Sequence, residues 1–307
     1  FSEFQHHILF LGNFNENYDL YKDLQTQGIR CYFNYQITAE LIDKINPKIF
    51  CIHNPPLSMF PKRLKDFRIL QKCWVILFHH AKTKLFPHVD LDIFVSKWIE
   101  DMYKDWRQYI KKSKIVHPSI DGTLYLNIKR EYTKKKDVMI GRIQSNTNHA
   151  FGKFSEDIEM LKKLKKTKFF LVGTGYDENN ANKKFTFAPI KIGKMPEYLS
   201  KLDIFYIWGG HNHVESWSRV VSEAMMSGIP VVIRDMKDGM SEQATKSKAC
   251  FLVNTKEEFI KIMQKLIDDP KLRKKHGELG RKWASENITI KNLRQDLINE
   301  MFEFGVK

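Results

Sequence analysis

The sequence predicts an α/β protein made of two domains, each built around a parallel β-sheet. The chain has 307 residues, which is enough for two domains of ordinary size. Short apolar runs alternate with amphipathic segments along the chain, and this alternation is typical of βαβ units. A polar and strongly basic stretch at residues 129–136 interrupts the alternation, and a new apolar strand follows it. We therefore interpret this stretch as an interdomain linker.

The elements follow one another in the same way in both halves. Strands are expected at residues 7–11, 28–35, 48–53, 74–78, 92–95 and 114–117, and the clearest helices among them at 18–26 and 38–45. The second half has strand candidates at 137–140, 168–172, 203–207, 230–233 and 249–253. Its helix candidates are residues 155–164, 197–201, 218–227, 256–266 and 292–304. We expect domains at 1–128 and 137–287, and a C-terminal helical segment at 288–307 that packs back toward the first domain.

The composition is that of a globular protein, with 42% hydrophobic and 28% charged residues. No apolar run reaches the length of a membrane span, and the start of the chain lacks the pattern of a signal peptide. The four cysteines are far apart and form no CxxC pair, which favours free thiols in a reducing compartment. We therefore expect a cytoplasmic protein, located in the host cytoplasm if the protein is viral, with peripheral membrane contact as a further alternative. The oligomeric state is not indicated.

The net charge of +15 indicates an anionic partner. Basic side chains outnumber acidic ones by 22 to 14 in residues 1–136 and by 29 to 22 in the rest. Nucleic acid, an anionic lipid surface or a phosphorylated glycan would fit this excess, which a nucleotide ligand alone does not require. The alternative is a lysine-rich surface that is simply solvated.

The most informative segment is residues 214–230, VESWSRVVSEAMMSGIP, in which Glu215 and Glu223 are eight residues apart. If Glu215 precedes a helix, Glu223 lies about two turns into it on a similar face. The helix N-terminus between them presents free N–H groups, which suit a diphosphate or sugar hydroxyls. Taken alone, the pair fits an ordinary amphipathic helix with two solvated glutamates equally well.

The segment resembles the E-x7-E region of the GT-B glycosyltransferases, specifically the fourth family, whose members are retaining enzymes. Further likenesses to this family lie at residues 141–143 (GRI), 172–175 (VGTG), 195–205, 238–242 (DGMSE), 269–273 and 277–281. The resemblance covers most of residues 137–287. It implies two Rossmann-like domains that face each other across a cleft. It also implies transfer of a hexosyl or pentosyl group from a UDP- or GDP-sugar with retention, without a metal or a cofactor.

The resemblance also implies roles for residues near the donor. Glu223 would bind the ribose hydroxyls, Glu215 would face the donor sugar, and the backbone of Ser216 and Trp217 would contact sugar or phosphate. The family has Phe-Gly where this chain has Trp217 and Ser218, so the resemblance does not identify the donor sugar.

Further candidates flank this segment. Arg142 would bind the diphosphate, and Lys153 is the best match to a lysine that the family places before the next helix; a solvated lysine is the alternative. Either His79 or His80, at the end of an apolar strand, would position sugar or acceptor, or else cap the strand. Three glycines would line the donor loops, namely Gly12, Gly173 and Gly193.

The acceptor is expected on the first domain, where basic and aromatic residues alternate at 59–72 and 97–114. The basic residues proposed to bind a polyanion are Lys62, Arg63, Lys65 and Arg68. The spread of charge over both halves favours DNA with a hydroxymethylated base, as modified by bacteriophage enzymes. An envelope glycan or lipid carrier at a membrane surface is the alternative, and a GT-B epimerase or binding module is a third reading.

Two short patterns resemble metal sites. Residues 211–215 (HNHVE) hold two histidines and a glutamate, and residues 90–92 (DLD) match the DxD of the other major glycosyltransferase fold. The first lies in an expected loop that includes Glu215, and the second introduces an apolar strand. We expect no metal at either.

Overall fold

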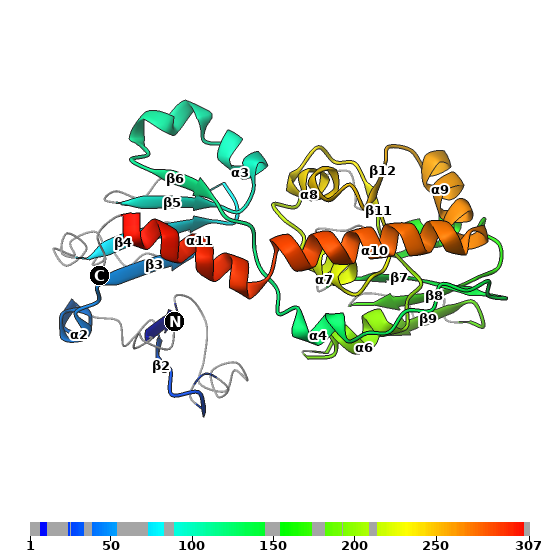
Figure 1. The fold of residues 1–307 in the computed structure, drawn as a ribbon, viewed down its shortest axis with the longest axis horizontal. Helices are drawn as coiled ribbons and strands as arrows, with labels where there is room; N and C mark the ends of the chain where they lie inside the picture. Colours follow the sequence, from blue (N-terminus) through cyan, green and yellow to red (C-terminus); the bar gives the residue numbers. More distant parts are fainter. Residues whose placement is uncertain are drawn as a thin grey trace. The chain divides into compact units, whose positions relative to one another are not determined.

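The chain forms two compact units, unit 1 at Phe1–Val116 and unit 2 at His117–Lys307 (Figure 1). The structure, a computed structural model, describes residues 7–10, 24, 26–33, 39–53, 73–82, 89–144, 154–173, 182–191, 193–208 and 214–303. Both units combine helices with parallel strands, which confirms the predicted α/β class with two Rossmann-like domains. Across these described ranges, no helix is long and apolar enough to cross a membrane.

The described residues of unit 1 form two parallel sheets. The first pairs β1 (His7–Phe10) with β2 (Arg30–Phe33). The second has the order β3–β4–β5–β6, with bounds Ile49–His53, Trp74–His79, Leu91–Phe94 and Ser113–Ile115. Its described helices are α2 (Ala39–Ile45), α3 (Lys97–Asp101) and the 3₁₀ helix η4 (Lys104–Tyr109). The central strands β4 and β5 are almost entirely buried, as expected for a parallel sheet covered on both faces.

Unit 2 is built on a six-stranded parallel sheet with the order β12–β11–β10–β7–β8–β9. The strands are β7 (Val138–Ile143), β8 (Thr167–Val172), β9 (Phe185–Ala188), β10 (Ile204–Ile207), β11 (Val231–Arg234) and β12 (Phe251–Val253). The chain runs outward from β7 to β9 and then returns to β10 on the other side of β7. The strand order therefore reverses between β7 and β10, and in such sheets ligands bind beyond the carboxyl ends of the strands at this point.

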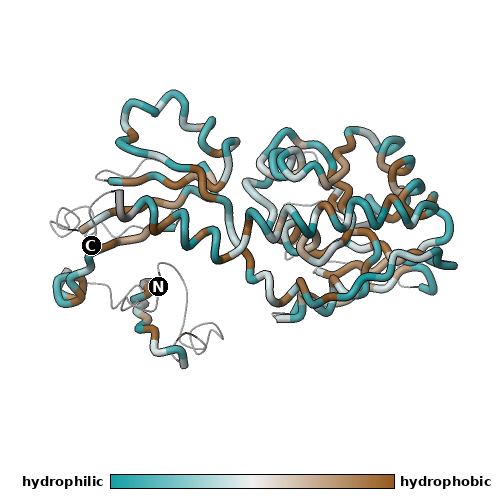
Figure 2. The backbone as a smooth tube through the Cα atoms, in the orientation of Figure 1, coloured by the Kyte–Doolittle hydropathy of each residue, from teal (hydrophilic) through white to brown (hydrophobic). Residues whose placement is uncertain are grey.

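Helices cover both faces of this sheet. Their bounds are α4 (Thr123–Leu126), α5 (Phe154–Leu161), α6 (Met195–Ser200), α7 (Arg219–Met226), α8 (Gly239–Ser247), α9 (Lys256–Asp268), α10 (Pro270–Asn287) and α11 (Ile290–Glu303). On one face, Ile140 and Phe169 share a buried core with Leu161 of α5 and Phe259 of α9. On the other face the chain packs very closely, because a Cβ on Gly141 would lie only 2.3 Å from Leu202 Cδ2. Figure 2 shows the hydrophobic residues of unit 2 concentrated along these strands.

Local sequence signals set the helix ends. The Thr255 side chain accepts a hydrogen bond from the backbone N–H of Glu258, and so caps the start of α9. Asp269 caps α10 in the same way, with Pro270 in the first turn, where its missing N–H costs nothing. Helix α7 ends at Met226, and two residues later Gly228 has a φ of +73°, a left-handed conformation that favours glycine. The signals of α7 and α9 adjoin the segments from which these two helices were expected.

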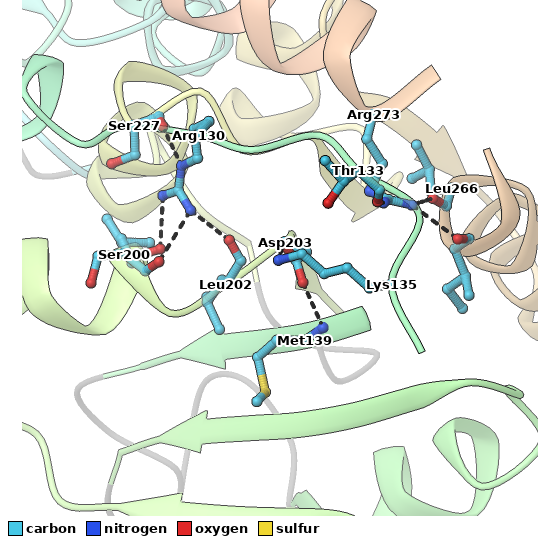
Figure 3. A network of polar contacts seen from close by, with 12 residues as sticks. Arg130, Thr133, Lys135, Met139, Ser200, Leu202, Asp203, Ser227, Leu266 and Arg273 are labelled. Atoms are coloured by element: carbon cyan, nitrogen blue, oxygen red, sulfur yellow. Dashed lines mark hydrogen bonds and ion pairs between the residues drawn. The ribbon is translucent and has the colours of Figure 1, made fainter. Parts of the chain in front are cut away.

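The basic stretch at residues 129–136 lies in unit 2 and is bonded to it (Figure 3). The Arg130 guanidinium donates to the carbonyls of Leu199, Ser200, Leu202 and Ser227 at 2.6–3.3 Å. Several of these carbonyls end helices α6 and α7, where a cation is favourable. Burial lowers the pKa of Arg130 to about 10, so the guanidinium stays charged at neutral pH.

Neighbouring residues of the same stretch also bond to unit 2. The Tyr132 hydroxyl donates to Gly228 O at 2.6 Å, and the Lys135 ammonium pairs with Asp203 at 2.6 Å. Arg273 of α10 donates to Thr133 O at 2.6 Å. The charges of this stretch therefore serve the packing of unit 2, besides any contact with an anionic partner.

Candidate functional site

Glu223 lies on α7 and is almost completely buried, with 4% of its surface exposed. Its carboxylate accepts a hydrogen bond from the Tyr125 hydroxyl, and the Arg219 Nε lies 3.3 Å away. Burial raises the pKa of Glu223, while the tyrosine and the arginine act in the opposite direction. Tyr125, on α4, was not identified from the sequence, since it belongs to no motif. A carboxylate held in this way can accept hydrogen bonds from ligand hydroxyls.

The backbone of Glu215 is fastened to the first turn of α8. Its N–H donates to Asp238 Oδ2 at 2.7 Å, and its carbonyl accepts from Met240 N at 3.2 Å. Asp238 also caps α8 by accepting from the N–H of Ser241 at 2.9 Å. A Cβ on Gly239 would lie 1.7 Å from Ser216 O, so only glycine fits this contact. The DGMSE turn seen in the sequence therefore positions the first glutamate.

Gln243 ties α8 to the start of α7. It is fully buried, and its amide oxygen accepts from Ser218 N at 3.2 Å. Its amide nitrogen donates to Ser222 Oγ at 2.7 Å and to Ser218 O at 3.2 Å. No motif in the sequence marks this residue. Together with Asp238, it fixes both ends of the short segment between Glu215 and α7.

The side chain of Trp217 is buried and stacks on His117, with ring centroids 3.8 Å apart and planes at 12°. The His117 ring in turn lies 3.1 Å from the Lys246 ammonium on α8. The indole is therefore held by protein groups on at least one face. Ser216, beside it, is only half-buried.

The carboxyl edge of the sheet holds three further sequence candidates. Arg142, on β7, is buried and forms an ion pair with Asp157 of α5. The Tyr206 hydroxyl also donates to Asp157, at 2.9 Å. Gly173 follows β8, where a Cβ would lie 2.6 Å from Gln144 O. Gly193 has a φ of +78° in the turn before α6, a left-handed conformation that favours glycine.

The structure distinguishes the two histidines of unit 1. His79 is fully buried, with Nε2 2.7 Å from Asp92 Oδ1 and Nδ1 3.1 Å from the Tyr103 hydroxyl. Both of its ring nitrogens are thus engaged inside unit 1. His80 is half-buried, and its Nε2 lies 3.3 Å from Nδ1 of His53 at the end of β3.

The pair of His80 and His53 is uncharged at neutral pH, because burial lowers both pKa values, that of His53 to about 4. His53 was not among the sequence candidates. Its position at the end of a predicted strand next to β4 is the signal that could have identified it, since parallel strands end at the same edge.

The DLD pattern has a structural explanation. Asp92 bonds to His79, while Asp90 accepts from Val75 N at 3.0 Å and pairs with Lys111. Within the ranges that the structure describes, no group of three or more His, Cys, Asp or Glu side chains could hold a metal. The remaining candidates lie outside the described residues; these are Lys153, Gly12, Lys62, Arg63, Lys65 and Arg68.

The chain resembles known proteins in sequence and in fold. The family model described as glycosyl transferases group 1 matches residues 128–283. None of the curated protein sequences compared matches the chain. Among solved structures, a glycosyltransferase from Rickettsia africae is 15% identical, with a TM-score of 0.76 over 98% of this chain and 90% of its own.

Two other solved structures have the same fold. HepE from Anabaena in complex with UDP-glucose is 13% identical, with a TM-score of 0.72 over 97% of this chain and 91% of its own. Sucrose-phosphate synthase from Thermosynechococcus elongatus is 12% identical, with a TM-score of 0.68 over 96% of this chain and 82% of its own. At these identities the likeness shows a shared fold of two Rossmann-like domains.

Proposed function

The chain belongs to the group 1 glycosyl transferases, and we propose that it transfers a sugar from a nucleotide sugar to a hydroxyl of a large anionic acceptor. The observation that carries this proposal is the arrangement of the two glutamates. Glu223 is a buried carboxylate on α7, and the Glu215 backbone is fixed by the capped start of α8. In this proposal, Glu223 accepts hydrogen bonds from the donor ribose and Glu215 faces the donor sugar.

The remaining contacts to the donor are proposed from the positions of residues in the motifs that resemble the family. The backbone of Ser216 and Trp217 would approach the sugar or phosphate, and Gly12, Gly173 and Gly193 would leave room for the nucleotide. UDP-glucose is the first donor to test, because the similar HepE structures hold UDP and UDP-glucose. A GDP-sugar is the second.

The chemical step breaks a sugar–phosphate bond, so the main requirement is to stabilise the departing diphosphate. Arg142 and Lys153 would supply positive charge, with no metal required. We propose retention of configuration by attack on the same face, with the leaving phosphate assisting. No protein nucleophile is needed in that route. Of the two histidines, His80 suits the reacting centre better, because His79 is fully buried against Asp92 and Tyr103.

Replacing Glu223 by glutamine should weaken nucleotide binding by about 10- to 100-fold, because a charged acceptor for hydroxyls is lost. The measurement is a thermal-shift titration with a panel of nucleotide sugars. The control is Glu257→Gln, which changes an exposed glutamate of α9 and should bind as the unaltered protein does. If no nucleotide stabilises the unaltered protein, the proposed donor class is wrong. If Glu223→Gln binds normally, the role of Glu223 is wrong.

For the acceptor, we propose duplex DNA that carries a hydroxymethylated base. Support comes from the net charge and from η4, where Trp106 and Tyr109 are 38% and 71% exposed beside the exposed Lys104. Exposed aromatic rings among cations suit unstacked bases and phosphates.

The acceptor test measures transfer of labelled sugar to hydroxymethylated duplex and to anionic vesicles that carry a lipid acceptor. We expect transfer to DNA only, and binding to plain duplex that falls steeply with salt. Transfer to the vesicles without duplex binding would contradict the DNA proposal. Donor consumption that needs no acceptor would instead indicate an epimerase.

A further inference from the structure

Gln144 is a buried residue whose side-chain amide has no partner among the residues that the structure describes. It directly follows β7 and is 4% exposed. In the part of the chain that the structure describes, neither Nε2 nor Oε1 makes a hydrogen bond. Buried polar side chains nearly always have partners, because an unpaired one costs free energy comparable to a lost hydrogen bond. An exception of this kind calls for an explanation, and a bound ligand is one.

The position of Gln144 coincides with the ligand-binding edge of the sheet. Strand β7 borders the point where the strand order reverses, and ligands bind beyond the carboxyl ends there. The Gln144 N–H donates to Val172 O at 2.9 Å, which holds the residue to the end of β8. The side chain lies close to Gly173, where a Cβ would come within 3.1 Å of Gln144 Cγ. Gly173 thus leaves room for the amide at this edge.

The surroundings indicate which part of a ligand would meet the amide. Side chains alternate along a strand, so Gln144 lies on the same face as Arg142, whose partner Asp157 is on α5. Helix α5 is the next described element after β7, and the first crossover of a doubly wound sheet places the helix N-terminus near a diphosphate. An amide can donate to a phosphate oxygen and accept from a hydroxyl at the same time.

We infer that the Gln144 amide binds the diphosphate of the donor nucleotide, with Nε2 donating to a phosphate oxygen and Oε1 accepting from a hydroxyl of the transferred sugar. The inference rests on the proposed use of a nucleotide sugar. It adds an uncharged donor to the cations Arg142 and Lys153. It also explains why a polar side chain persists where an apolar one would suit the ligand-free protein.

If Gln144 has this role, replacing it should change nucleotide binding without lowering the stability of the ligand-free protein. Gln144→Leu removes the unpaired amide, so the ligand-free variant should melt at the same temperature as the unaltered protein or higher. The same change should weaken UDP binding by about tenfold, since one hydrogen bond to a charged group is lost. Uridine, which lacks phosphate, should bind both proteins equally. A purely structural glutamine would give the opposite result, with lower stability and no selective loss of UDP.

The control is Thr167→Val. Thr167 is also buried, and its hydroxyl also has no partner among the described residues, but it begins β8 at the amino edge of the sheet. This variant should keep both stability and UDP affinity. Gln144→Met, which conserves the side-chain volume, is the second test variant in case the leucine variant does not fold.

The experiment is calorimetric titration of all four proteins with UDP and uridine, or with GDP and guanosine if the unaltered protein prefers guanine. A UDP affinity of both Gln144 variants within about twofold of the unaltered protein would overturn the inference. An equal loss for uridine would overturn it too, since the contact would then not be to phosphate. If the unaltered protein binds no nucleoside diphosphate, the proposed function itself fails, which is a different result.

Discussion

Gly239→Ala should reduce kcat/KM for sugar transfer by about 100-fold or more. The added Cβ would lie 1.7 Å from Ser216 O and 2.4 Å from Ser216 C, both of which are backbone atoms. No side-chain rotation can relieve that overlap, so either the start of α8 or the Glu215–Ser216 backbone must move. A displacement of about 1 Å is enough to cost that much rate in an aligned site. The measurement is the steady-state rate with the identified donor and acceptor.

The same variant should also lose stability, by about 1–3 kcal/mol, as overpacked sites do. Gly280→Ala is the matched control, because this glycine is also buried in a helix but its Cβ would meet the flexible Met225 side chain at 3.3 Å. That control should keep activity and change stability by less than about 1 kcal/mol, since alanine favours a helix. If Gly239→Ala kept more than about a tenth of the activity, the α8 contact would not be what positions Glu215.

The strands of unit 2 could be predicted from the sequence because most are buried on both faces. Apolar runs such as residues 168–172 and 203–207 stand out against polar surroundings, and β8 and β10 coincide with them closely. The short β9, with the sequence FTFA, was not predicted because its central threonine is exposed and the run is brief. Likewise, residues 97–109 hold the two short helical segments α3 and η4, where a pattern of mixed basic and aromatic residues indicated no particular element, whereas the predicted strand at 114–117 coincides in part with β6.

The candidate site could be predicted only in part, and the reason is physical. Glu215 and Glu223 are identifiable because they share one short segment with a recognisable spacing. Asp238, which bonds to Glu215, lies in the DGMSE segment that the sequence also marks. Tyr125, which acts on Glu223, and Gln243, which bonds to Ser218 and Ser222, lie far away along the chain, and nothing local marks a lone tyrosine or glutamine as a partner. The contacts of the basic residues at 129–136 could not be predicted either. The sequence shows that Arg130 is a cation, but only the structure shows that backbone carbonyls accept its hydrogen bonds.

Asp157→Asn should lower the free energy of unfolding of unit 2 by about 3–5 kcal/mol. Asp157 and Arg142 form an ion pair whose side chains are 2% and 1% exposed, and the Tyr206 hydroxyl donates to the same carboxylate. Without the carboxylate, a buried guanidinium keeps its charge and loses the ion pair with Asp157. Chemical denaturation measures the effect. Glu159→Gln is the control, because Glu159 lies on the same helix but its pair with Lys162 is exposed, and the loss there should stay below about 1 kcal/mol.

A double variant separates the structural role of this pair from its role in transfer. Arg142→Met combined with Asp157→Leu replaces both charges by apolar side chains of similar shape, although leucine is bulkier than aspartate, and such exchanges often restore or even exceed the original stability. The double variant should therefore regain the stability that Asp157→Asn loses. It should remain poor at sugar transfer, because the proposed cation for the diphosphate is gone. Full activity in a stable double variant would mean that Arg142 serves packing alone, and that Lys153 and the start of α5 bind the diphosphate without it. An unstable double variant would instead show that Tyr206 needs the carboxylate as its hydrogen-bond acceptor.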